Sequence, residues 1–262
     1  MVAFIFLTRG VSMIFAESID TIARDIKVVR PTVLTGVPRV YEKLHARILA
    51  KGREGSAITR AIFAWASRVA ERKGDAIVNR GSTSAWLGFQ ARMADRLVFH
   101  KIREGVGGRI RFAVSGSAPL GDKLGRWFLG VGIPLIEGYG LTETSPVLSV
   151  MPVEAIRFGT VGPPIPNVEI RIAEDGEILA RGPSIMPGYW NKPDATAAVL
   201  KDGWFYTGDI GRFDERGYLM ITDRKKELLV TSGGKKIAPA PIETAIRRHQ
   251  LVAEAVLLGD KR

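Results

Sequence analysis

The apolar and polar positions in the middle of the chain predict a strand, a helix and a second strand in succession. Residues 109–115 (RIRFAVS) alternate apolar and charged side chains and then become apolar, which is typical of a strand entering a core. Residues 120–129 have helical spacing with Asp122 in the first turn, and residues 133–136 form a short apolar run. These three segments predict a parallel β-α-β unit and therefore an α/β fold.

Two segments rich in glycine and hydroxyl groups follow the predicted strands. They are SGSAP at 115–119 and EGYGLTE at 137–143. Ligands of parallel sheets bind beyond the carboxyl ends of the strands. We therefore expect both segments to face one crevice.

After about residue 150 the pattern favours small antiparallel β structure. Three segments have two apolar runs around a turn, as hairpins do: 167–182, 209–223 and 226–239. The first is predicted to turn at Asp175-Gly176, the second between Asp214 and Gly217, and the third at Gly233-Gly234. A final unit is predicted as a helix over 241–249 followed by a strand over 253–259.

Two further segments have clear patterns. Residues 56–74 predict a helix with an apolar face, formed by Ile58, Ile62, Trp65 or Ala66, and Val69. The apolar run over 2–7 lacks the basic start and the cleavage site of a signal peptide, so we expect buried helix or strand there. Because this run opens abruptly, we expect Met1 to be an internal methionine of a longer protein. No stretch contains eighteen consecutive apolar residues, so no transmembrane helix is predicted.

Composition is that of a globular protein, with 262 residues, 46% hydrophobic and 25% charged. The absence of cysteine excludes a disulfide scaffold, a thiolate metal site and a cysteine nucleophile. The three histidines, His45, His100 and His249, lie far apart in sequence, which argues against a zinc site.

The net charge of +11 is concentrated in residues 39–111, which hold sixteen Lys and Arg against six Asp and Glu. A solvated helix face is one interpretation of this basic region. The alternative is a surface that meets acidic phospholipid headgroups, with Trp65 or Trp86 near the interface. No nucleic-acid motif accompanies the charge, so nucleic acid is not an expected partner.

Three segments resemble known functional motifs but lack a residue that each motif requires. GSAPLGDK (116–123) has Asp122 where a phosphate-binding loop needs lysine, and GVGGRI (105–110) lacks the third glycine of a dinucleotide fingerprint. Ser115 and Ser117 have no nearby histidine in the sequence that would indicate a hydrolase.

The stretch EGYGLTETSP (137–146) carries chemistry suited to a nucleotide. Glycines 138 and 140 allow the backbone to approach a flat ligand, and Tyr139 can lay its ring against that ligand. The Thr142 hydroxyl can bond a phosphate oxygen, and the Glu143 carboxylate can hold Mg²⁺. An ordinary turn is the alternative interpretation of these residues taken alone.

Four motifs together resemble the adenylate-forming enzymes in order and spacing: YGLTE (139–143), GWFYTGD (203–209), DRKKEL (223–228) and SGGKKIAPAPIE (232–243). GVPRVYEKL at 36–44, followed by the basic helical region, looks like the long-chain fatty-acid–CoA ligases of that superfamily. The resemblance covers essentially the whole chain.

The resemblance implies ATP, Mg²⁺ and coenzyme A as cofactors and a fatty acid as substrate. Tyr139 would stack on adenine between backbone walls of Gly116, Ser117, Gly138 and Gly140. Thr142 would touch the α-phosphate, Glu143 would bind the metal, and Asp209 and Arg224 would contact the ribose. Asp223 would be the hinge of a mobile C-terminal domain. A passage for coenzyme A would be lined by Gly233, Gly234, Lys235 and Ile237.

The implied fold is the later part of a large α/β domain over 1–222, with a parallel sheet and helices. It would include a basic helical insertion at 39–111 and an antiparallel β-rich subdomain at 151–222, and 223–262 would open a small α+β C-terminal domain. The family's phosphate-cradling loop and C-terminal lysine have no match here, so the sequence looks truncated at both ends. We therefore expect this chain alone to be inactive.

Other functions stay open on the sequence alone. Another adenylate-forming enzyme, an aryl-CoA ligase or a peptide-synthetase adenylation domain, would share the four motifs. A non-catalytic module that binds membranes or nucleic acid through 39–111 would use only the basic region. For the ligase we expect a cytoplasmic location, peripheral at the inner face of the membrane.

Overall fold

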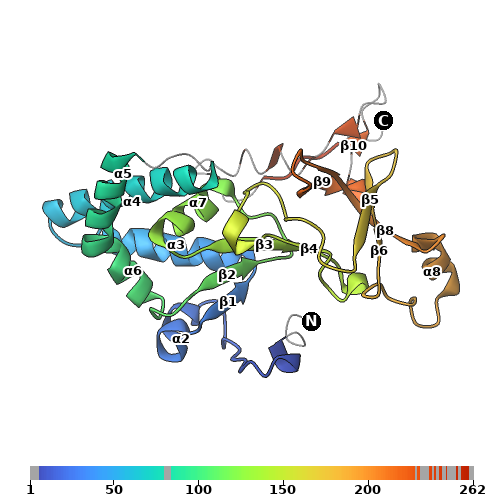
Figure 1. Ribbon diagram of the computed structural model, residues 1–262, viewed down its shortest axis with the longest axis horizontal. Coiled ribbons are helices and arrows are strands. Elements are labelled where there is room, and N and C mark those ends of the chain that lie inside the picture. The colour runs from blue at the N-terminus through green and yellow to red at the C-terminus, as the bar shows by residue number, and fades with distance from the viewer. Residues whose placement is uncertain are drawn as a thin grey trace. The chain divides into compact units, whose positions relative to one another are not determined.

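The computed structural model describes residues 6–79, 84–227, 229–230, 236–237, 239, 242–243, 246, 252 and 255–259, the side chains of 227, 230 and 236 excepted (Figure 1). The chain divides into two compact units. One comprises Met1–Tyr139 with Val150–Gly159, and the other comprises Gly140–Ser149 with Thr160–Arg262.

The first unit is built on parallel strands. β1 (Val33–Gly36), β2 (Phe112–Ser115) and β3 (Leu135–Tyr139) pair in parallel in this order. The two-residue strand β4 (Ser149–Val150) comes next in the sheet order, where the chain returns to the first unit. Helix α7 (Asp122–Val131) connects β2 to β3, which confirms the predicted parallel β-α-β unit.

The second strand of that unit starts later than predicted. Gly132 ends α7 with a left-handed backbone (φ 96°), and the Ile133 amide donates to the Phe128 carbonyl. This bond belongs to a helix C-cap, so Ile133 is not available to the sheet ladder. The strand therefore begins at Leu135 and extends to Tyr139.

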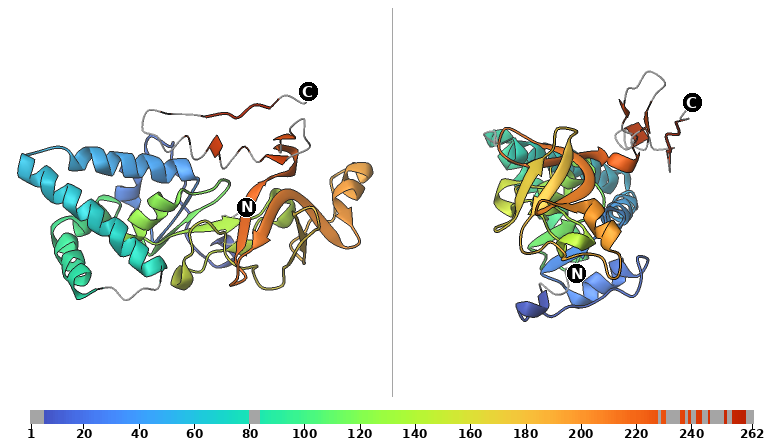
Figure 2. Two further views of the ribbon diagram at one scale, coloured as in Figure 1. Left: turned by 90° about the horizontal axis from the view of Figure 1, so that it is seen from above. Right: turned by 90° about the vertical axis from the view of Figure 1, so that its right-hand side faces the viewer.

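Several helices that precede β2 form one packed group around a shared core, and those after α2 make up the basic region at 39–111. They are α2 (Ile22–Val29), α3 (Pro38–Gly52), α4 (Ala57–Val78), α5 (Ala85–Ala94), the π-helical turn η1 (Asp95–Phe99) and α6 (His100–Gly105). Figure 1 and Figure 2 show α4 lying alongside α7, the contact that anchors this group to the β-α-β unit.

Two glycines permit the close approach of α4 and α7. A Cβ at Gly74 would collide with the Arg126 carbonyl, and one at Gly130 would collide with the Ala70 carbonyl. Small residues at such positions let two helix backbones meet where larger side chains would hold them apart.

The apolar face predicted for 56–74 is confirmed only in its second half. Ala66 and Val69 are fully buried, whereas Ile58 is 73% exposed and Ile62 is 36% exposed. The fully buried residues of α4 begin at Ala66, whereas Phe63, one turn earlier, is only partly buried against the core. Trp65 packs partly buried against that core.

Tyr41 of α3 links strands β1 and β2. Helix α3 begins with Pro38, a residue suited to the first turn of a helix. The Tyr41 side chain is buried, and its hydroxyl lies 2.8 Å from the Val114 carbonyl and 3.0 Å from the Leu34 carbonyl. One phenol thus bridges β1 and β2.

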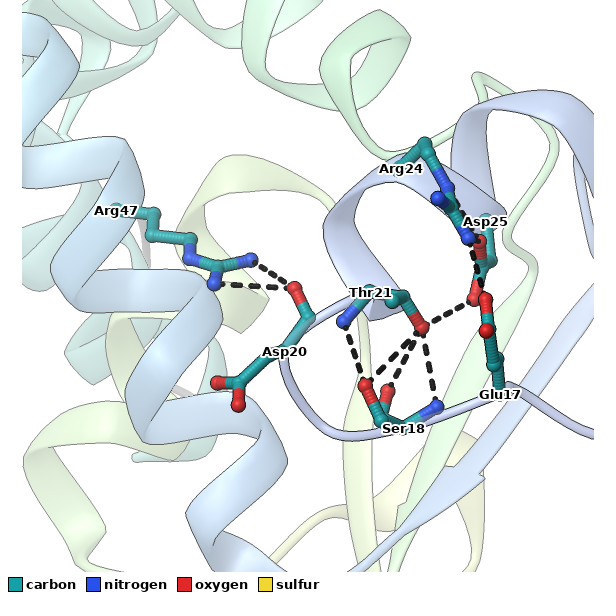
Figure 3. A network of polar contacts seen from close by, with 7 residues as sticks. All are labelled: Glu17, Ser18, Asp20, Thr21, Arg24, Asp25 and Arg47. Atoms are coloured by element: carbon teal, nitrogen blue, oxygen red, sulfur yellow. Dashed lines mark hydrogen bonds and ion pairs between the residues drawn. The ribbon is translucent and has the colours of Figure 1, made fainter.

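A polar network joins the segment before α2 to α3 (Figure 3). The Arg47 guanidinium donates to the Asp20 carbonyl at 3.1 and 3.2 Å, and Lys43 Nζ lies 2.8 Å from Asp20 Oδ1. The Thr21 hydroxyl donates to Asp25 at 2.7 Å within the first turn of α2.

Of the apolar run over 2–7, the structure describes only Phe6 and Leu7. Leu7 is 58% exposed, so the prediction of burial is wrong for it, since a helical turn that ends at Thr8 presents no long face to bury.

The second unit carries an antiparallel sheet. β5 (Glu169–Ile172), β6 (Glu177–Arg181), β8 (Trp204–Phe213) and β7 (Leu200–Lys201) pair in this order, and β9 (Leu219–Arg224) also pairs with β8. Helix α8 (Pro193–Val199) precedes β7. The first two hairpins are confirmed, with turns at Asp175-Gly176 and between Asp214 and Gly217.

The last segments are described only in part. β10 (Leu229–Val230) pairs with β11 (Lys236–Ile237), which confirms the third hairpin, although its turn at Gly233-Gly234 lies outside the described residues. Residues 242, 243 and 246 are helical, as predicted for 241–249. The strand predicted over 253–259 is wrong for 255–259, where the Leu257 amide donates to Glu243 Oε1 at 2.7 Å instead of to a neighbouring strand.

Across the residues described above, no helix is long and apolar enough to span a membrane.

Candidate nucleotide-binding site

The carboxyl ends of β2 and β3 bring two predicted segments of the first unit together. Ser115 lies opposite Glu137 in the strand register, and a Cβ on Gly116 would lie 3.9 Å from the Gly138 carbonyl. Gly116, Ser117, Gly138 and Tyr139 therefore gather at the carboxyl ends of β2 and β3, as the sequence predicts for this part of the two segments. Ser117 has a left-handed backbone (φ 71°) that turns the chain after β2.

Tyr139 is the last residue of β3 and is 9% exposed. The strand fixes its backbone, so the ring is presented from a sheet edge. Gly140 follows in the chain, and a Cβ there would collide with the Pro146 carbonyl. The turn itself therefore requires glycine at 140, and an approach of Gly140 to a ligand stays a prediction.

Glu137 is a buried carboxyl group that the sequence reading did not single out. It is 6% exposed, and its Oε1 accepts the Leu120 amide proton at 2.8 Å. Burial raises the pKa of Glu137 to about 7, against the lowering effect of the Leu120 hydrogen bond. This contact ties the loop after β2 to β3. The sequence feature that could have identified Glu137 is a charged residue within the otherwise apolar strand PLIEGY.

Next to it, the Ser115 hydroxyl is buried and has no hydrogen-bond partner within the described residues. The strand register places Ser115 and Glu137 on the same face of the sheet. That face thus carries two buried polar side chains at the carboxyl ends of β2 and β3.

In the second unit, residues 142–144 form a 3₁₀ turn that holds Thr142 and Glu143. Thr144 is fully buried, and its hydroxyl accepts the Leu141 amide at 2.9 Å and lies 2.7 Å from the Pro146 carbonyl. The turn leaves Thr142 exposed and Glu143 half-buried.

Glu143 contacts a segment far away in the sequence. The Met186 amide donates to the Glu143 carbonyl at 2.8 Å, and the Tyr189 hydroxyl donates to Glu143 Oε1 at 2.9 Å. Desolvation and this carboxylate raise the pKa of the Tyr189 phenol. Tyr189 is a second residue that sequence reasoning missed.

The two residues predicted to bind ribose lie together. Asp209 of β8 faces Arg224 of β9 in the strand register, and Arg224 Nε lies 3.1 Å from Asp209 Oδ1. The Asp209 side chain is 6% exposed, whereas that of Arg224 is 61% exposed. The Thr207 hydroxyl accepts the Asp209 amide proton at 3.1 Å, which fixes the backbone of β8 at Asp209.

Lys225 of the DRKKEL motif forms ion pairs with two carboxylates. Its Nζ lies 2.7 Å from Asp175 and 2.6 Å from Glu177. The hydrogen bond with Asp175, and then that with Glu177, raises the pKa of Lys225. Glu177 is buried and its Oε1 also accepts the Gly208 amide at 2.9 Å, so the Asp175-Gly176 turn supports the segment that carries Asp209.

The predicted hinge and the predicted coenzyme A passage are described only in part. Asp223 is buried in β9 opposite Ile210, and the Arg224 amide donates to its Oδ1 at 2.6 Å. Ile237 lies in β11 opposite Leu229. Gly233, Gly234 and Lys235 lie outside the described residues.

Oxygen ligands for a cation are sparse. No group of three or more His, Asp or Glu side chains that could hold a metal ion occurs in the part of the chain that the structure describes. Mg²⁺ is commonly held by one or two carboxylates together with substrate phosphates. The half-buried Glu143 carboxylate and the exposed Thr142 hydroxyl fit that mode of binding.

A parallel sheet with glycines at the carboxyl ends of its strands is typical of nucleotide-binding α/β proteins. The AMP-binding enzyme family matches residues 1–190, and the C-terminal domain of AMP-binding enzymes matches residues 226–262. The chain belongs to the family of AMP-binding enzymes, which confirms the resemblance drawn from the four motifs.

Curated relatives and solved structures agree with this assignment. The chain is 43% identical over 248 residues to the long-chain-fatty-acid–CoA ligase FadD15 of Mycobacterium bovis, covering 95% of this chain and 41% of the relative. It is 36% identical over 272 residues to long chain acyl-CoA synthetase 1 of Arabidopsis thaliana, covering 97% and 40%. The crystal structure of ATP-bound MatB from Rhodopseudomonas palustris matches with a TM-score of 0.67 and 29% identity, over 98% of this chain and 43% of that one. The predicted fold class is thereby confirmed, and the chain spans about two fifths of the length of these relatives.

Proposed function

We propose that the whole protein uses ATP to convert a long-chain fatty acid into its coenzyme A thioester. The observation that carries the proposal is the 43% identity to a long-chain-fatty-acid–CoA ligase, over 95% of the chain. The positions of the candidate residues within each unit support it.

In the first step the fatty-acid carboxylate oxygen attacks the α-phosphorus of ATP. The new P–O bond gives acyl-AMP, and pyrophosphate leaves with the electrons of the broken P–O bond. Tyr139 stacks on adenine beside the backbone of Gly116, Ser117 and Gly138, and Thr142 donates to the α-phosphate. Catalysis by such groups consists of positioning and of stabilising charge.

The ribose is held by Asp209 and Arg224. The carboxylate of Asp209 is an acceptor for the two ribose hydroxyls, and its neighbour Arg224 fixes the orientation of that carboxylate at 3.1 Å. Glu143 is the carboxylate that would hold Mg²⁺, which when bound offsets the negative charge of the phosphates.

In the second step the coenzyme A thiolate attacks the acyl carbonyl carbon and expels AMP. We assign 1–222 to the AMP-binding domain and 223–262 to the start of a C-terminal domain that moves about Asp223 between the steps. The pantetheine arm then passes Gly233, Gly234, Lys235 and Ile237. The family match that begins at residue 226 supports this division.

A panel of acids tests the substrate class. Pyrophosphate release by the whole protein is measured with palmitate, octanoate, benzoate and an amino acid, each with ATP and MgCl₂. The proposal predicts turnover with palmitate and a large preference over benzoate. Preference for benzoate or for the amino acid would instead identify an aryl-CoA ligase or an adenylation domain.

A second proposal concerns a peripheral contact with an acidic membrane surface on the cytoplasmic side. Its support is a row of exposed apolar side chains on α5, Trp86, Phe89 and Met93, at helical spacing. The Trp86 and Phe89 rings stack with centroids 5.7 Å apart, and Arg92 and Arg96 lie on the same stretch of helix. The basic charge of residues 39–111 complements an anionic surface.

Vesicle sedimentation distinguishes this contact from a solvated helix face. The protein is expected to sediment with phosphatidylserine vesicles and not with phosphatidylcholine vesicles, and Trp86→Ala with Phe89→Ala should abolish sedimentation. Trp190→Ala is the control, since Trp190 is 89% exposed but lies in the other unit. Equal sedimentation of the α5 variant and the control would contradict the contact.

A further inference from the structure

The side chain and the backbone of Glu143 are both held by one short segment. The Tyr189 hydroxyl donates to Glu143 Oε1 at 2.9 Å, and the Met186 amide donates to the Glu143 carbonyl at 2.8 Å. Both contacts lie within the second unit. Because both the main chain and the side chain of Glu143 are hydrogen-bonded to this segment, the carboxylate has a defined orientation relative to the 142–144 turn.

Tyr189 is itself fixed by the first turn of α8. Its amide donates to the Thr196 hydroxyl at 2.9 Å, and that hydroxyl donates to the Lys192 carbonyl at 2.9 Å. At the preceding Gly188 a Cβ would lie 2.9 Å from Thr196 Cγ2, so the segment packs tightly on the helix. The phenol is therefore presented from an anchored backbone.

A carboxylate has two oxygens, and the phenol engages one of them. Within the described part of the chain, Tyr189 is the side chain that hydrogen-bonds Glu143. An O–H donor on one oxygen fixes the rotation of the carboxylate and leaves the lone pairs of the other oxygen for a cation. Residues that orient a ligand in this way change metal affinity without touching the metal.

We propose that Tyr189 is a positioning residue for Glu143, holding one carboxylate oxygen so that the other is directed to the divalent cation of the bound nucleotide. The inference rests on the proposed function, since it takes Glu143 as the residue that holds this cation. It adds a residue outside the four motifs.

Tyr189→Phe tests the inference because it removes one oxygen atom and keeps the ring. Calorimetric titration with ATP across a series of MgCl₂ concentrations gives the Mg²⁺ concentration for half-maximal nucleotide binding. We expect Tyr189→Phe to raise that concentration about tenfold, as removal of a supporting hydrogen bond does at metal sites. Tyr206→Phe is the matched control, since it makes the same chemical change in the same unit at a ring that lies 5.3 Å from Lys201 Nζ.

The Glu143→Gln background separates the inference from the proposed function. If Tyr189 acts through Glu143, Tyr189→Phe should have no further effect on the Mg²⁺ requirement once Glu143→Gln is present. An unchanged requirement in Tyr189→Phe, with a raised one in Glu143→Gln, would overturn the inference and leave the proposed function intact. An unchanged requirement in Glu143→Gln itself would overturn the metal assignment. Paramagnetic Mn²⁺ binding in the presence of ATP gives a second readout that does not depend on turnover.

Discussion

The guanidinium of Arg224 lies 3.1 Å from the carboxylate of Asp209, across the β8–β9 pair, with Asp209 buried and Arg224 mostly exposed. An ion pair with so exposed a partner contributes little to stability. The main effect of this ion pair is to fix the orientation of the buried Asp209 carboxylate, which is the proposed acceptor for the ribose hydroxyls.

Asp209→Ala should therefore weaken AMP binding at least tenfold, because the variant lacks the carboxylate that accepts the ribose hydroxyl protons. The melting temperature should change little, because the ion pair of this carboxylate with the exposed Arg224 adds little stability. Arg181→Ala is the matched control, because Arg181 forms a surface ion pair with Glu169 in the same sheet. Calorimetric titration with AMP measures the effect. Equal AMP affinity in Asp209→Ala and Arg181→Ala would show that Asp209 has only a structural role in β8.

Glu143→Gln keeps the shape of the side chain and removes its charge. The whole protein carrying this change should lose acyl-AMP formation, because an amide oxygen is a weaker ligand for Mg²⁺ than a carboxylate. Its folding should change little, since glutamine still accepts the Tyr189 hydroxyl proton. Acyl-AMP is measured after a single turnover, and undiminished formation would refute the assignment of Glu143.

Glu137 should make stability fall as the pH rises. Its folded pKa of about 7 lies above the unfolded value of 4.5, so the folded state binds more protons between these values. The contribution of this carboxyl group is then fully present below about pH 4.5 and is lost as the pH rises through about 7, an effect of about 3 kcal/mol.

The measurement compares unfolding free energies of the protein and of Glu137→Gln at pH 5 and pH 8. Glutamine does not titrate, and its carbonyl still accepts the Leu120 amide proton. The protein should lose stability relative to the variant on going to pH 8. Glu154→Gln, at an exposed position, should follow the unaltered protein. A pH dependence shared by all three proteins would exclude Glu137 as its source.

Gly130→Ala should destabilise the first unit by about 3 kcal/mol, because a Cβ would force α4 and α7 apart. Gly88→Ala in α5 is the control, since a Cβ there meets nothing within 4 Å. That change should be neutral or stabilising by up to about 1 kcal/mol, following helix propensity. Thermal unfolding compares the two, and similar midpoints would show that the helices are not in close contact.

Gly234→Trp should separate the two half-reactions. If the Gly233-Gly234 turn borders the coenzyme A passage, the whole protein should still form acyl-AMP but transfer the acyl group slowly. Single-turnover measurements of acyl-AMP and acyl-CoA test this. Equal loss of both steps would mean that the change only disrupts the hairpin, where glycine readily adopts positive φ.

Local patterns were sufficient for most of the fold. The β-α-β unit and the hairpins follow from periodicity and turn residues, which depend on near neighbours in the chain. β3 begins later than predicted because the Ile133 amide is used in the C-cap of α7. The predicted apolar face of α4 is buried only in its second half, so Ile58 is exposed although its spacing is the same. These details depend on packing, to which hydrophobic spacing alone is insensitive.

The candidate site divides in the same way. The pairing of Asp209 with Arg224 could be expected, because two of the motifs lie at the two ends of the hairpin predicted over 209–223. Tyr189 could not, since it meets Glu143 from 46 residues away, and neither could the bond between Lys225 and the buried Glu177. Such contacts are set by tertiary structure and leave no short-range signature in the sequence.

The central claim is tested most directly by incubating the whole protein with palmitate, ATP, MgCl₂ and coenzyme A and following the products by mass spectrometry. The account predicts palmitoyl-AMP as a transient and palmitoyl-CoA with AMP and pyrophosphate as final products, all absent in Glu143→Gln. Formation of ADP and phosphate in place of AMP and pyrophosphate, or no palmitate-dependent consumption of ATP, would contradict it.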